Sequence, residues 1–226
     1  MFLCCIALRI LAAQPPISGR AGLIYYAEGD IELNSRLLLQ FIPMVRVAAG
    51  QTLRVNRGRA ELLLQPQNFL RLADHSTVEM KSDALSIVEL ILGGAAILDI
   101  SNADARNSIS ASCSGPVAQV LRPGIYRFDC RHGETPDSLT VVRGRARIAS
   151  NGRTVELTSN QLILLIPGLN VRNLHGRNSD AFDHWSASRT ALIARKRGQE
   201  TILEDKNKPP PAGVIILPDN RGIPPN

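Results

Sequence analysis

The sequence predicts a mainly β fold, either a β-sandwich or a short β-solenoid, with one C-terminal α-helix and a proline-rich tail. Apolar and polar residues alternate through two segments that share an R-G-R-A core, Arg57–Ala60 and Arg143–Ala146. Turn-forming residues recur about every 8–12 residues, as in sandwiches and barrels of short strands. After Ser179 the apolar period becomes that of a helix. We therefore expect a β domain over 21–178, a closing amphipathic helix over 179–198 and a flexible tail over 199–226.

The strands of the first half are recognised by period-two alternation and by the turns between them. They are expected over 23–33, 53–64, 69–72 and 77–80. Gly58 lies between two arginines and suits a turn there, because glycine adopts positive φ freely. Ser86–Leu92 and Ala95–Ile100 predict two further apolar strands, which Gly93-Gly94 would join as a hairpin.

The second half repeats this organisation with shorter segments. Its strands are expected over 109–113, 117–121, 125–130, 139–148, 154–157 and 161–166. Pro123-Gly124 indicates a tight turn, since Pro before Gly suits a type II turn. Asn151-Gly152 is a strong hairpin signal between the strands on either side of it.

The cysteines leave two arrangements open. Cys4 and Cys5 lie in the N-terminal apolar stretch, which leaves Cys113 and Cys130 to form a disulfide in an oxidising compartment. If 109–113, 117–121 and 125–130 form a plain meander, these two cysteines lie about 10 Å apart, which is too far for a disulfide. A disulfide therefore requires a sandwich corner or a strand crossing. The alternative is two separate buried thiols.

The expected helix carries one apolar face and ends at a glycine. That face consists of Phe182, Trp185, Leu192 and Ile193. Ser179 or Asp180 can cap the first turn, and Gly198 is expected to end the helix. The face either covers an open end of the β body or docks a partner. In the tail beyond, Val214–Leu217 is a short apolar island that could add a strand to a sheet.

The N-terminus indicates export. Residues 1–14 are apolar except for Arg9 and Gln14, and the small residues Ala12-Ala13 precede Pro15 as at a cleavage site. The stretch is shorter than the roughly 20 apolar residues of a membrane-spanning helix, so we expect no integral membrane span. No Lys or Arg precedes the apolar run, so we interpret 1–14 as a signal segment with a truncated start. The expected location is periplasmic or secreted, and cytoplasmic if 1–14 is not a signal.

Composition limits the choice of partners. The 226-residue chain is 44% hydrophobic but only 4% aromatic, so its core must be aliphatic. Its formal charge of +6 attracts anionic envelope polymers, lipid headgroups or nucleic acid. The arginines are scattered with no basic block, which favours an ordinary soluble surface. Neither R-G-R segment contains an aromatic side chain for base stacking, which disfavours nucleic acid as a partner.

No sequence motif indicates catalysis, a metal or a cofactor, and we expect none of the three. The histidines share no metal-ligand spacing, and phosphate-binding glycine motifs are absent. The carboxylates occur mostly singly. A carbohydrate-active enzyme or a carbohydrate-binding β domain is the main alternative, and an enzyme of that kind would need two carboxylates facing one cleft. A basic nucleic-acid-binding protein is a further alternative.

Five segments, in order, resemble the FecR-type (ferric-citrate regulator-like) extracytoplasmic β domain. They are Ala21–Ile31 with its E-G-D bend, Gly50–Val55 with Gly58–Leu62, Phe69–Leu72, the P-G-x-Y-R strand Pro123–Asp129, and the D-x-F-x-x-W-x-x-x-R helix Asp180–Arg189. The likeness spans residues 21–195.

The resemblance implies a stand-alone bacterial β domain outside the cytoplasm, without catalysis. Known members of the family sense an outer-membrane receptor and relay its state to a sigma factor. They do so through a cytoplasmic segment and a spanning helix that precede the β domain. This sequence shows neither, so we expect a binding or scaffold module in envelope sensing, whose partner is a protein or an envelope polymer of the periplasm.

Overall fold

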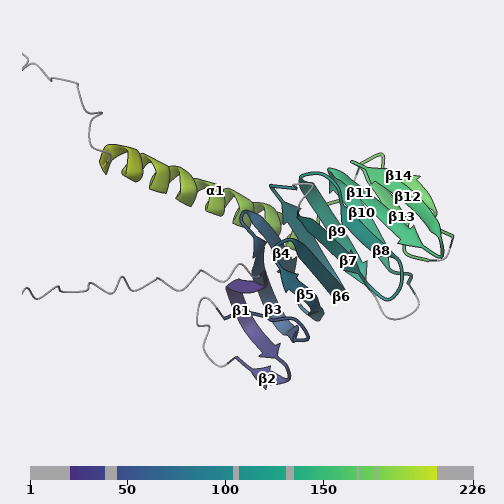
Figure 1. Cartoon of the computed structure of the whole chain (residues 1–226), viewed down its shortest axis with the longest axis horizontal. Coiled ribbons are helices and arrows are strands. Elements are labelled where there is room, and N and C mark those ends of the chain that lie inside the picture. The colour runs from purple at the N-terminus through teal and green to yellow at the C-terminus, as the bar shows by residue number, and fades with distance from the viewer. Residues whose placement is uncertain are drawn as a thin grey trace, which may run out of the picture. The chain divides into compact units, whose positions relative to one another are not determined.

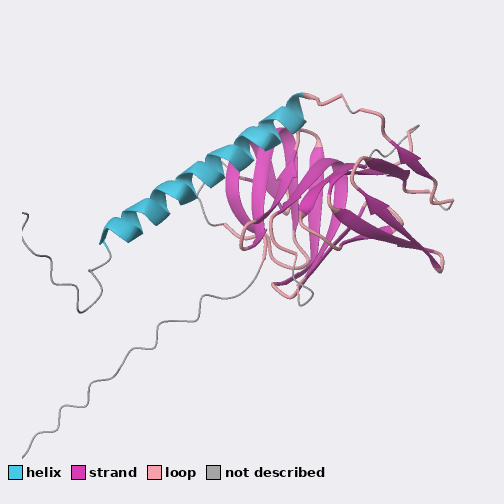
Figure 2. Cartoon of the chain, turned by 90° about the horizontal axis from the view of Figure 1, so that it is seen from above, coloured by secondary structure: helices cyan, strands magenta, loops and turns pink. Residues whose placement is uncertain are grey.

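The computed structural model describes residues 21–38, 45–103, 107–130, 135–166, 168–176 and 178–207, with side chains in the helix up to residue 199. The chain divides into two compact units between Asn178 and Ser179. The first is built of strands, and the second holds the helix of the described chain (Figure 2). The predicted mainly β fold with one C-terminal helix is confirmed. The expected signal segment 1–14 and residues 208–226 lie outside the described residues.

The strands of the first unit follow one another along the sheet in nearly their sequence order (Figure 1). Their bounds are β1 Leu23–Leu33, β2 Arg36–Leu37, β3 Thr52–Gln65, β4 Asn68–Leu72, β5 Ser76–Ala84, β6 Ile87–Ile100, β7 Ser108–Ser112, β8 Val117–Val120, β9 Gly124–Cys130, β10 Ser138–Arg143, β11 Arg145–Ser150, β12 Arg153–Thr158, β13 Gln161–Leu164 and β14 Val171–Asn173.

The long strands β1, β3 and β6 belong to two layers at once. The first half of β6 pairs with β5 and β7, and its second half pairs with β4 and β9. In the same way β3 pairs first with β5 and then with β4, while β1 follows it along its whole length. One layer therefore continues through β4, β9, β10, β13 and β14. The other continues through β2, β5, β7, β8, β11 and β12.

Glycines mark the places where strands pass from one layer to the other. Gly29 of β1 and Gly58 of β3 are register partners with φ of 90° and 99°. A Cβ on Gly58 would overlap the carbonyl oxygen of Glu28, so only glycine allows this close crossing. The first R-G-R-A segment is thus a bend inside β3 and not the predicted turn.

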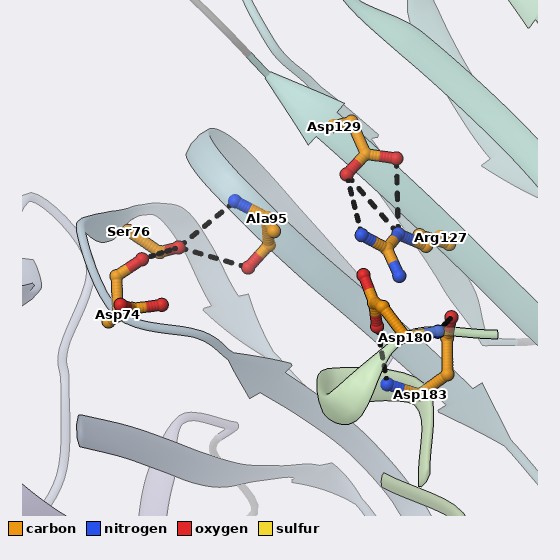
Figure 3. A network of polar contacts seen from close by, with 7 residues as sticks. All are labelled: Asp74, Ser76, Ala95, Arg127, Asp129, Asp180 and Asp183. Carbon is orange, nitrogen blue, oxygen red and sulfur yellow. Dashed lines mark hydrogen bonds and ion pairs between the residues drawn. The ribbon is translucent and has the colours of Figure 1, made fainter. Parts of the chain in front are cut away.

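The predicted Gly93-Gly94 hairpin is wrong, because β6 runs unbroken through both glycines. Gly94 has φ of 77°, and a Cβ there would approach the Ser76 hydroxyl to 2.5 Å. That hydroxyl donates to the carbonyl of Ala95 and accepts from its N–H, each over 3.0 Å (Figure 3). The two glycines therefore bend the strand against β5 and do not reverse it.

The core is one contiguous cluster, mostly of aliphatic side chains contributed by both layers. Leu53 and Val55 from the first half of β3 and Leu62 from its second half are all fully buried. Tyr126 and Phe128 of β9 are the large aromatic members of this cluster. Leu, Ile, Val and Ala make up most of the cluster, as the low aromatic content of the sequence predicts.

The helix α1 spans Ala181–Asn207 and begins at a reciprocal cap. The Asp183 N–H donates to the Asp180 carboxylate over 2.9 Å, and the Asp180 N–H donates to the Asp183 carboxylate over 3.1 Å (Figure 3). The predicted end at Gly198 is wrong, so residues 199–207 are helical and not tail. One glycine costs a helix only about 1 kcal/mol, and no proline follows before Pro209.

Candidate functional site

The P-G-x-Y-R motif forms a fixed corner at the start of β9. Gly124 is buried, and a Cβ on it would overlap the carbonyl oxygen of Arg143. Tyr126 is fully buried, and its hydroxyl donates to the carbonyl of Arg122 and accepts from the N–H of Arg145. Burial raises the pKa of this phenol, while the backbone hydrogen bonds lower it by less. The tyrosine therefore ties together two backbone segments that each present an arginine.

The second R-G-R-A segment separates β10 from β11 at this corner. Gly144 has φ of 108°, and a Cβ on it would overlap the Tyr126 hydroxyl. Beyond Gly144 the chain leaves β9 and β13, the partners of β10, and pairs with β8 and β12. The glycine thus lets the chain change layers, as Gly58 does in β3. It also places Arg145 and Arg147 on β11.

These arginines line a cavity of about 510 Å³, which we call the arginine groove. It lies where β7, β8, β11 and β12 run side by side. Its polar lining includes Ser108, Gln119, Arg122, Arg145, Arg147 and Glu156. Gln119, Arg147 and Glu156 are register partners across three adjacent strands, and the Gln119 amide donates to the Ser108 hydroxyl over 3.4 Å.

The groove is electrostatically positive. Arg147 is paired with Glu156, whose carboxylate lies 2.8 Å from the guanidinium. Arg122 and Arg145 are exposed and have no carboxylate within ion-pair distance among the described residues. Three guanidinium groups thus face one carboxylate, an arrangement suited to an anionic ligand. It offers no second carboxylate, within the described lining, for glycosidase chemistry.

Sequence reasoning did not find this site. In the sequence the arginines are scattered, and Arg122 and Arg145 are far apart in the chain. The available signal was the alternation of Arg145 and Arg147 around a buried Ala146, which places both on the same face of a strand. What joins them to Arg122 is the pairing of β8 with β11, and no local pattern reveals that pairing.

A second cluster of charges is internal and serves the fold. Arg71 of β4 contacts Glu61 of β3 at 2.7 Å and Asp99 of β6 at 2.9 Å, and all three are at most 4% exposed. The same guanidinium lies 5.8 Å from the ring centroid of Phe69. Arg71 engages both carboxylates, so the three side chains together fix the register of β3, β4 and β6. The two carboxylates are therefore not offered to a substrate as an acid and a base.

A further ion pair lies on β9, which pairs with the same half of β6 as β4 does. Arg127 and Asp129 are two residues apart on one face of the strand, and the guanidinium donates to the carboxylate at 3.0–3.2 Å (Figure 3). Arg127 is the arginine of the P-G-x-Y-R motif. The ion pair with Asp129 gives Arg127 a structural role on β9.

Cys113 and Cys130 form a disulfide, with Cα atoms 5.3 Å apart. The plain meander that would have separated them does not exist. Strand β9 leaves β8 and pairs with the second half of β6, while β7 pairs with the first half. Ser112 at the end of β7 lies opposite Ile91, and Cys130 lies opposite Gly94. The two strand ends therefore meet at the middle of β6, which is the crossing that a disulfide required.

The predicted apolar face of α1 is only partly correct. Phe182 and Ile193 are 7% and 8% exposed, and the Phe182 and Trp185 rings stack at 5.8 Å. Leu192 is 41% exposed and does not belong to this face. At about 100° per residue, position 193 returns to the azimuth of position 182 within about 20°, whereas position 192 is about 80° away. Ser186, one turn after Phe182, is buried and belongs to this face, whereas Leu192 does not.

Two further observations concern ligand and membrane chemistry. Within the described ranges, no three His, Cys, Asp or Glu side chains gather in a way that could hold a metal ion. None of the described helical sequence is both long and apolar enough to span a bilayer.

Comparison with protein families and with curated proteins gives no match. Among solved structures, two crystal structures of a candidate anti-sigma factor from Parabacteroides distasonis are similar to part of this chain. The sequence identities are 13% and 14%, and the TM-score is 0.46 for both. Each match covers 57% of this chain and 60% of the other, so this chain spans less than two thirds of those structures.

Proposed function

We propose that this protein is a FecR-like β module that works outside the cytoplasm, binds a protein or an envelope polymer, and has no active site. The observation that carries the proposal is the Cys113–Cys130 disulfide, which joins two strand ends at the centre of the sheet. Structural disulfides persist in oxidising compartments and are rare in the cytosol. The disulfide therefore supports the export that residues 1–14 predict.

The absence of catalysis is supported by the groove chemistry. The arginine groove has one carboxylate in its described lining, and that carboxylate is held by Arg147. The Glu61 and Asp99 carboxylates are bound to Arg71 and are nearly inaccessible. Glycoside hydrolysis needs two carboxylates on either side of a substrate, and neither place provides them.

The resemblance to FecR-type domains is supported by what its motifs do in the fold. The E-G-D bend contains Gly29, which crosses Gly58, and the P-G-x-Y-R strand contains the Gly124 and Tyr126 corner. These motif residues bend strands and hold the bends. A family defined by such residues would share a scaffold and not a reaction.

The test is the location and thiol state of the native protein. Cells are fractionated after rapid alkylation of free thiols, and the protein is analysed by mass before and after reduction. We expect it in the periplasm or the medium, with an N-terminus near Ala13–Pro15 and with Cys113 and Cys130 protected until reduction. A cytoplasmic protein with both thiols free would overturn the proposal. Turnover of a polysaccharide that is lost on Glu156→Gln would overturn its non-enzymatic part.

A further inference from the structure

The spacing of the groove arginines is set by the sheet. Arg145 and Arg147 lie two residues apart on β11 and flank the buried Ala146. Their backbones are thus about 6.8 Å apart along the strand, at the antiparallel rise of about 3.4 Å per residue. Arg122 follows β8, the strand next to β11, and the Leu121 N–H donates to the Arg145 carbonyl over 2.9 Å. Three guanidinium stems therefore start from fixed points on two adjacent chains.

These positions are fixed by buried groups and not by the arginines themselves. The Tyr126 hydroxyl holds the backbone of both Arg122 and Arg145, and Gly144 has room for no side chain next to that hydroxyl. The guanidinium of Arg147 is oriented by Glu156. The stems are thus placed in advance, while Arg122 and Arg145 keep their charges available within the described surroundings.

The ligand chemistry follows from guanidinium geometry. A guanidinium group binds carboxylate or phosphate through a planar pair of N–H donors. Each exposed ion pair contributes little to binding, so a single small anion gains little at such a site. An extended peptide repeats its side chains on one face every two residues, at the same spacing as Arg145 and Arg147. Ser108 and Gln119 add neutral donors and acceptors that suit peptide groups.

We propose that the arginine groove binds an extended acidic segment of a partner protein, with carboxylates at alternate positions. This inference rests on the proposed function and deepens it, because it assigns the partner a chemistry and a place on the module. Of the partners that the positive charge allows, the groove favours an acidic peptide. Ser108 and Gln119 offer hydrogen-bonding groups on the adjacent strands β7 and β8. The described lining contains no aromatic side chain on which a base or a sugar would stack.

The experiment uses the full oxidised chain and a fluorescein-labelled peptide of alternating Glu and Thr, with fluorescence anisotropy as the readout. We expect saturable binding at low salt that weakens as salt is added. The double variant Arg122→Gln with Arg145→Gln should raise Kd about tenfold, since two charge-assisted contacts are lost. The matched control is Arg54→Gln with Arg172→Gln, which removes the same charge from exposed positions on β3 and β14 outside the groove. Its Kd should change less than about twofold.

Several results would overturn the assignment. Equal weakening by both double variants would mean attraction to the overall charge and not to the groove. Displacement of the peptide by an equal concentration of inorganic phosphate would make this a small-anion site. If a single-stranded oligonucleotide binds more tightly than the peptide through Arg122 and Arg145, the ligand of the groove is nucleic acid and not an acidic segment. If the peptide does not bind even at low salt, the groove is not a binding site for it. If the peptide fails while the chain is still exported and disulfide-bonded, only the groove assignment falls. If the thiols are free in the cytoplasm, the proposed function falls whatever the peptide does.

Discussion

The Tyr126 hydroxyl and the Arg145 backbone N–H are joined by a 3.0 Å hydrogen bond across the bend between β10 and β11. The same hydroxyl contacts the carbonyl of Arg122. A core side chain on β9 thus holds the backbone from which two groove arginines extend. Stability of the corner and geometry of the groove therefore depend on a single phenol.

Replacing Tyr126 with Phe should lower the free energy of unfolding by about 1–3 kcal/mol. The change keeps the ring and leaves the Arg145 N–H and the Arg122 carbonyl without their partner, and a buried unsatisfied group carries a cost of that size. Urea denaturation followed by circular dichroism measures the loss. Tyr25→Phe is the control, because Tyr25 is 41% exposed and should change stability by less than about 0.5 kcal/mol. Equal effects of the two changes would show that the corner is not held by this hydroxyl.

Stability should also fall at high pH because of the same residue. Burial raises the pKa of Tyr126 above its ordinary value of 10.0. The unfolded chain therefore releases this proton at lower pH than the folded chain does. The stabilisation is fully present below the unfolded pKa and is lost as pH rises through the folded pKa. Urea denaturation from about pH 9 to pH 11 should show a steeper decline for the native sequence than for Tyr126→Phe. Parallel declines would contradict this assignment.

Gly58→Ala should be among the most damaging single substitutions in the β unit. Its Cβ would overlap the Glu28 carbonyl, and its φ of 99° is strained for any side chain. We expect a loss of more than about 3 kcal/mol, or failure to fold. Gly152→Ala separates the two causes, because Gly152 has φ of 75° but nothing within 4 Å of the added carbon. Its loss should be only about 1 kcal/mol, from backbone strain alone. Similar losses at both glycines would remove the argument from close crossing.

Gly58 and Gly94 show what local patterns could and could not predict. Alternation correctly placed most strands and the mainly β class, because burial on one face is recorded in neighbouring residues. Glycine indicated where the backbone changes direction but not by how much. At Gly58 and Gly94 the chain bends between layers and does not reverse. Only the strands that pair with the two glycines decide this, β1 for Gly58 and β9 for Gly94.

The candidate site was beyond local prediction for a related reason. Arg122, Arg145 and Glu156 meet only because β8, β11 and β12 are adjacent, and this order depends on the layer change at Gly144. The disulfide is a similar case. Its two possible outcomes turned on whether β9 pairs with β8 or β6, and the sequence left that open. Leu192 and Ile193 differ by one position, and the helical azimuth from Phe182 was enough to separate them.

Removing the disulfide should destabilise the β unit by about 3 kcal/mol. Cys113 and Cys130 are 17 residues apart, and the chain-entropy model gives about that value for a loop of this length. The double variant Cys113→Ala with Cys130→Ala should unfold at lower urea concentration than the oxidised native protein. The native protein treated with a reductant should change in the same direction, because both treatments release the ends of β7 and β9 from one another. Alanine at both positions also removes two buried sulfur atoms, so the reduced native protein isolates the cross-link itself. If reduction lowers the unfolding free energy by less than about 1 kcal/mol, the meeting of these strand ends on β6 is held by the ladder alone, and the disulfide is not what stabilises it.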